Sequence, residues 1–76
     1  MIRAKKITIR SKKEDSAFLY HIFEAQEGLT AYSTLPFTPH DQIRDVELIF
    51  SAEALTEVRE LLQDLGTILT VIDDKN

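Results

Sequence analysis

Residues 46–66, VELIFSAEALTEVRELLQDLG, decide the fold, because the apolar period changes once within them. At the start, apolar side chains alternate with the others, as in a strand that buries one face: Val46, Leu48 and Phe50. Farther on they recur at three- and four-residue spacing, as on one face of a helix: Leu55, Val58, Leu61, Leu62 and Leu65. Ser51 is predicted to cap the start of this helix and Gly66 to end it. The stretch therefore predicts a strand followed by a helix.

The chain before this stretch predicts a strand, a helix and a second strand. In residues 5–10, Ile7 and Ile9 alternate with basic and hydroxyl side chains, which is the pattern of a half-buried strand. Residues 11–14 (SKKE) fit a capping box, and the helix that follows is predicted to end at Gly28. Residues 29–35 (LTAYSTL) read as the second strand, which Pro36 ends.

Residues 67–72 (TILTVI) are β-branched and apolar, and they predict a fourth strand. The order βαββαβ indicates an α+β, ferredoxin-like domain that fills residues 1–76. We expect a four-stranded antiparallel sheet, in the order 4-1-3-2, with both helices on one face. The strand phase places Lys6, Thr8 and Arg10 on the open face of that sheet, together with Glu47, Ile49 and Tyr32.

The composition excludes several classes of function. The 76 residues contain no cysteine, which excludes disulfides, thiolate nucleophiles and iron–sulfur clusters. Six of the nine basic residues fall in the first thirteen positions, whereas the rest of the chain carries all thirteen acids. With a net charge of −4, this asymmetry favours opposite charges on neighbouring elements over a nucleic-acid-binding arm. No apolar run could span a bilayer and no signal peptide is evident, so we expect a cytoplasmic protein without a membrane partner.

Three segments carry a family resemblance: FLYHIFEAQEGLTAYSTL, DVELIF and EVRELLQDL. The helix end EAQEGL, the ST of the next strand and the VEL strand before a leucine-rich helix resemble short bacterial proteins grouped as domain of unknown function 4911. The resemblance covers roughly residues 6–70, except that the loop PFTPHDQIR is longer than the hairpin expected there. It implies a bacterial protein, but it supplies no activity and no catalytic residues.

One candidate site is an anion site at the predicted start of the first helix, formed by Arg10, Ser11, Lys12 and Lys13. Exposed backbone N–H groups and the positive end of a helix dipole can hold a phosphate there. Acylphosphatases, which share the βαββαβ order, place their anion loop similarly. The glycine-rich turn of that family is missing here, and two acids, Glu14 and Asp15, already occupy the helix start.

Other chemistry-bearing residues lack the partners that a catalytic or metal site needs. The two histidines, His21 and His40, have neither a nucleophile nor a third ligand at a useful spacing. Glu24 and Glu27 lie at the predicted end of the first helix, where the dipole disfavours acids. We interpret them as solvated residues, since no third ligand completes a cation site. No catalytic residue, metal or cofactor is therefore predicted.

The remaining hypothesis is a surface that pairs with another molecule. A chain of this size gains little stability from one core, which makes burial against a second copy favourable. Tyr32 and Ile49 on the open face, with Phe37 in the loop, are the candidate interface residues. Self-association is also expected to bury parts of residues 67–72. We expect a non-enzymatic homodimeric interaction or regulatory module that pairs through its open face or an edge strand. A small-anion site and weak nucleic-acid binding by the basic N-terminal strand are the alternatives.

Overall fold

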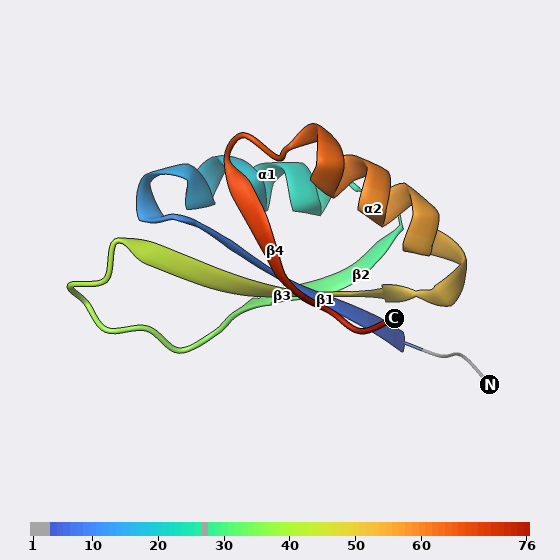
Figure 1. Cartoon of the computed structure of the whole chain (residues 1–76), viewed down its shortest axis with the longest axis horizontal. Coiled ribbons are helices and arrows are strands. Elements are labelled where there is room, and N and C mark those ends of the chain that lie inside the picture. Colours follow the sequence, from blue (N-terminus) through green and yellow to red (C-terminus); the bar gives the residue numbers. More distant parts are fainter. Residues whose placement is uncertain (1–3, 27) are drawn as a thin grey trace.

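A computed structural model describes residues 4–26 and 28–76 of the chain. Four strands, two helices and two short 3₁₀ turns follow one another in the described chain (Figure 1): β1 (Ala4–Lys12), η1 (Lys13–Asp15), α1 (Ser16–Ala25), β2 (Leu29–Thr34), β3 (Ile43–Ser51), η2 (Ala52–Ala54), α2 (Leu55–Asp64) and β4 (Leu69–Asp74). The α+β class, the four-stranded antiparallel sheet and the two helices are confirmed.

The strands are hydrogen-bonded in the order β2-β3-β1-β4, and all neighbours are antiparallel. Read from the other edge, the same sheet runs β4-β1-β3-β2. The two central strands are nine residues long and pair over their full length, from Ala4↔Ser51 to Lys12↔Ile43. Each edge strand has six residues. Both helices lie on the same side of the sheet (Figure 1), so its other face is left uncovered by helices.

The core forms between the helices and the inward-facing positions of the central strands. β1 and β3 contribute every second residue, in the phase expected from the sequence: Ile7, Ile9, Val46, Leu48 and Phe50. Helix α1 adds Leu19 and Phe23, and α2 adds Val58 and Leu62. Full burial of such a side chain stabilises a fold by roughly 1.5–3 kcal/mol, which makes this cluster the main source of stability.

The predicted capping box at Ser11 is wrong, because β1 continues through this residue. Ser11 pairs with Arg44 of β3, is buried, and donates its hydroxyl to the carbonyl of Lys12 at 3.2 Å. The helix begins only at Ser16, after the turn η1. The β1–β3 ladder continues as far as Lys12↔Ile43, so Ser11 and Lys12 lie in the sheet and not at a helix start.

Neither glycine acts as predicted. Helix α1 ends at Ala25, three residues before Gly28, and α2 ends at Asp64. Gly66 does not adopt left-handed backbone; its N–H donates to the carbonyl of Gln63 at 3.1 Å. Gly28 is required for a different reason, since a Cβ there would lie 2.9 Å from the Cβ of Ala54. Ser51 precedes η2 in extended conformation, but its side chain makes no capping hydrogen bond.

Candidate functional site

The four predicted anion-binding residues do not form one site: Arg10, Ser11 and Lys12 line a hollow of about 250 Å³ that also contains Asp15, whereas Lys13 lines a different hollow. Alternation along β1 turns Arg10 and Lys12 to the open face and Ser11 into the core. Arg10 is already engaged by Asp45 of β3, with Nε to Oδ1 at 2.8 Å and Nη2 to Oδ2 at 3.0 Å. The hydrogen bond from Arg10, together with its charge, holds the pKa of Asp45 below its ordinary value despite some desolvation. The Arg10 guanidinium is therefore bound to a carboxylate of the protein itself.

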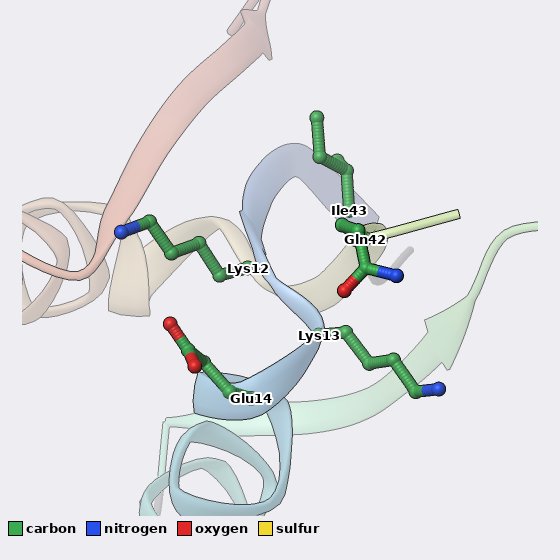
Figure 2. Close-up of a pocket in the computed structure, with 5 residues that line it drawn as sticks. All are labelled: Lys12, Lys13, Glu14, Gln42 and Ile43. Atoms are coloured by element: carbon green, nitrogen blue, oxygen red, sulfur yellow. The ribbon is translucent and has the colours of Figure 1, made fainter. Parts of the chain in front are cut away.

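A hollow of about 560 Å³ lies where β1 passes into η1, and it is lined by Lys12, Lys13, Glu14, Gln42 and Ile43 (Figure 2). Figure 2 shows the Lys12 and Lys13 side chains extending to opposite sides of the strand, with the Glu14 carboxylate on the side of Lys12. The backbone N–H of Lys13 donates to the carbonyl of Gln42 at 2.8 Å. The two ammonium groups diverge, one N–H is occupied and a carboxylate lines the hollow. This arrangement is unfavourable for a small anion.

The predicted position of Tyr32 on the open face is wrong. Tyr32 pairs with Leu48, a core residue, so it lies on the helix-covered side of the sheet. A register shift between Leu29 and Ala31 moves the strand by one position, and one position exchanges the faces. The ring stacks on Tyr20 of α1, with ring centroids 5.3 Å apart.

The Tyr32 hydroxyl donates to Glu24 Oε1 at 2.6 Å, at the end of α1. This hydrogen bond to a carboxylate is the largest cause that raises the pKa of Tyr32, with smaller effects of desolvation and of the negative charge. The hydroxyls of Tyr20 and Thr34 also share a hydrogen bond. Tyr32 thus joins α1 to β2 and is no free contact on the open face.

Ile49 does lie on the open face, half-buried and opposite Lys6 of β1 and Ala31 of β2. The surface around it is mostly polar, because Lys6 and Glu47 approach to 3.9 Å and Arg10 pairs with Asp45 nearby. The exposed Ile43 lies in the same phase at the end of β3. The centre of the face therefore offers little apolar area, among charges that neutralise one another.

Phe37 lies in the β2–β3 connection, which projects from one end of the sheet (Figure 1). Its side chain is 49% exposed, and the guanidinium carbon of Arg44 lies 3.6 Å from its ring centroid. Arg44 is itself buried, and it donates to the carbonyls of Asp41 and Ile43 at 2.8 and 2.9 Å. Phe37 thus has one ring face against this anchored guanidinium.

The edge strand β4 carries exposed apolar side chains within the stretch 67–72, part of which the sequence analysis expects a dimer to bury. β4 pairs with β1 alone among the described strands, and its Val71 and Ile72 are each 42% exposed. A hollow of about 220 Å³ lies beside this edge under α2, with Leu62, Leu69 and Val71 among its lining residues. The apolar character of TILTVI on both faces is the sequence signal for this edge.

An ion pair lies beside this hollow, because Arg59 and Asp74 are among its lining residues. Arg59 of α2 holds Asp74 at the end of β4, with both nitrogen–oxygen distances at 3.1 Å. Asn76 continues the contact, because its side chain donates to the backbone carbonyl of Lys6 at 2.7 Å. The hydrogen bonds from Arg59 and Asn76 keep the pKa of Asp74 below its ordinary value. The end of β4 is therefore bound to α2 through Asp74 and to β1 through Asn76.

His21 and His40 are exposed. Within residues 4–26 and 28–76, no three histidine or acidic side chains are close enough to hold a metal ion. Glu27, the partner of Glu24 in the acidic pair, lies outside the described residues. None of the helices in the described part is long and apolar enough to cross a bilayer.

Comparison with family models, with curated proteins and with solved structures gave no match to this chain.

Proposed function

We propose that the protein is a non-enzymatic interaction module of ferredoxin-like fold that forms a homodimer through the edge of β4. The observation that carries this proposal is an edge strand with two exposed apolar side chains next to an apolar hollow. The outward N–H and C=O groups of such a strand can pair with another strand. Two antiparallel copies of β4 would join two sheets about a twofold axis. Following the expectations from the sequence, we assign the module to the bacterial cytoplasm.

The charges on the open face favour edge pairing over face pairing. Burying that face would remove water from the Arg10–Asp45 and Lys6–Glu47 pairs, and desolvation of ion pairs is costly. The opposite edge, β2, is less suited, because Ala31 and Ser33, the exposed ones among its described side chains, add little apolar area. Among the described residues of the two edge strands, the large exposed apolar side chains are therefore Val71 and Ile72 of β4.

The exposed area sets the strength of the expected dimer. Val71 and Ile72 each retain 42% of their exposure, so burying the remainder contributes roughly 1 kcal/mol per side chain, or about 4 kcal/mol for two copies. Backbone hydrogen bonds across the new ladder add to this, whereas association costs at least about 4 kcal/mol. We therefore expect a weak dimer, with a dissociation constant of about 10–1000 μM.

Sedimentation velocity across a concentration series of about 10–1000 μM tests this proposal. The wild-type sedimentation coefficient should rise with concentration. Val71→Lys and Ile72→Lys should each keep the protein monomeric, because each places a charge at the pairing edge. The matched control is Ser33→Lys on the opposite edge, which should dimerise as the wild type does. A wild type that stays monomeric throughout, or a control that dissociates equally, would overturn the proposal.

A further inference from the structure

A second hollow, of about 370 Å³, lies at the other edge of the sheet, between the end of α1 and β2. It is lined by Phe23, Glu24, Leu29, Ala31 and Tyr32. Its walls combine two aromatic residues, two aliphatic side chains and one carboxylate. Pockets of this size accommodate small ligands, and a few placed polar groups then set the chemistry of recognition.

Among the described residues, this hollow is lined by one carboxylate and by no basic side chain. Glu24 belongs to none of the three ion pairs among the described residues, and its Oε1 accepts only the neutral hydroxyl of Tyr32. The last turn of α1 contains no basic residue. The carbonyl end of a helix carries a partial negative charge, equivalent to about half an elementary charge. The helix end and the Glu24 carboxylate therefore both favour a cation at this place.

The aromatic wall is suited to the same ligand. Tyr20 stacks on Tyr32 but does not line the hollow, so the remaining surface of the Tyr32 ring borders it. An ammonium group near an aromatic face is attracted by the ring quadrupole, and a carboxylate forms a charge-assisted hydrogen bond with it. Leu29 and Ala31 provide apolar contacts for a methylene chain.

We propose that this hollow binds an alkylammonium group, as presented by a free primary amine or by a lysine side chain. The site is independent of the β4 edge, since β2 and β4 are the two opposite edges of the sheet. The Tyr32 hydroxyl holds Glu24 in place, and the Glu24 carboxylate receives the ammonium group. A neutral group of the same shape would gain only the apolar contacts.

An NMR titration of the ¹⁵N-labelled full chain with n-butylammonium chloride tests the site, with n-butanol as the neutral control. Saturating shifts are expected at the amides of Glu24, Ala31 and Tyr32, with a dissociation constant of about 1–10 mM. Glu24→Gln keeps an acceptor for Tyr32 but loses the charge, and it should weaken binding about tenfold. The matched control Glu60→Gln, on the exposed surface of α2, should bind as the wild type does.

Two further probes distinguish the sources of the ammonium group. Tighter binding of an extended lysine-containing peptide than of n-butylammonium, with added shifts at Ser33, would assign the site to a lysine side chain on a strand. Equal binding would assign it to a free amine. Equal shifts with n-butanol, an unchanged affinity of the Glu24→Gln variant, or no saturation at any concentration would overturn the proposal.

Discussion

Replacement of Gly28 by alanine perturbs the closest approach between the α1–β2 connection and η2. A Cβ at position 28 would lie 2.9 Å from the Cβ of Ala54, whereas carbon atoms normally approach to about 3.5–4.0 Å. The Ala54 Cβ is bonded directly to the backbone and is buried, so it cannot rotate away. Overpacking of this kind costs about 1–3 kcal/mol. The lower entropy of the unfolded alanine chain offsets about 0.4–1 kcal/mol, which leaves a net loss of up to about 2.6 kcal/mol.

Urea unfolding followed by far-ultraviolet circular dichroism measures this loss, and a double-mutant cycle identifies its cause. Ala54→Gly removes the opposing methyl group and alone should cost up to about 1 kcal/mol. In that background Gly28→Ala should be neutral or stabilising, because the contact no longer exists. The coupling free energy between the two changes should therefore be about 1–3 kcal/mol.

Two outcomes would refute this reasoning. If Gly28→Ala stabilises the otherwise unchanged protein, position 28 has room for a methyl group and the close approach is absent. If Gly28→Ala destabilises both backgrounds equally, glycine is needed there for its backbone conformation and not for space. Either result would show that the close contact with Ala54 is not the reason for glycine at position 28.

Arg44→Leu should lower the free energy of unfolding by about 1–3 kcal/mol, because it removes donors from two carbonyls and the cation above Phe37. Urea unfolding measures the lost free energy. If the amides of residues 36–42 exchange as slowly in Arg44→Leu as in the wild type, Arg44 does not hold this loop and the prediction is wrong. The pKa of Asp45 is lowered in the folded state by Arg10, so its contribution to stability is present above the unfolded pKa and is lost as pH falls through the folded pKa. Acidification should therefore destabilise the wild type more than Asp45→Asn, by at most about 1 kcal/mol at this exposed pair, and parallel pH profiles would contradict it.

The sequence predicted the elements well wherever one period dominated. The alternation through Ile7 and Ile9, and through Val46 to Phe50, correctly placed the inward side of both central strands. Boundaries were less certain, because local signals compete with pairing. Ser11 has the chemistry of a helix cap, but the partner strand extends to Ile43 and holds Ser11 in the ladder. Nothing in the local sequence reports that length of partner.

The candidate interface depended on register, which the sequence does not encode locally. Tyr32 was assigned to the open face by counting along its strand, and the irregularity after Leu29 reversed that assignment. The same irregularity brings the Tyr32 hydroxyl to Glu24. The hollow between the end of α1 and β2 could therefore not be predicted from the sequence. Arg44 was also missed as a core position, because its charge hid the apolar phase that it shares with Val46.

The place of β1 between β3 and β4 has a consequence for synthesis of the chain on the ribosome. The Arg10–Asp45 ion pair can form only after Asp45 has been synthesised, 35 residues later, and the residues of β4 that pair with β1 are synthesised later still. Until β3 and β4 have both been made, β1 lacks at least one partner strand, so the nascent chain exposes an unpaired strand edge that can aggregate. Slow translation after residue 51 would prolong this exposure and increase the demand for chaperones.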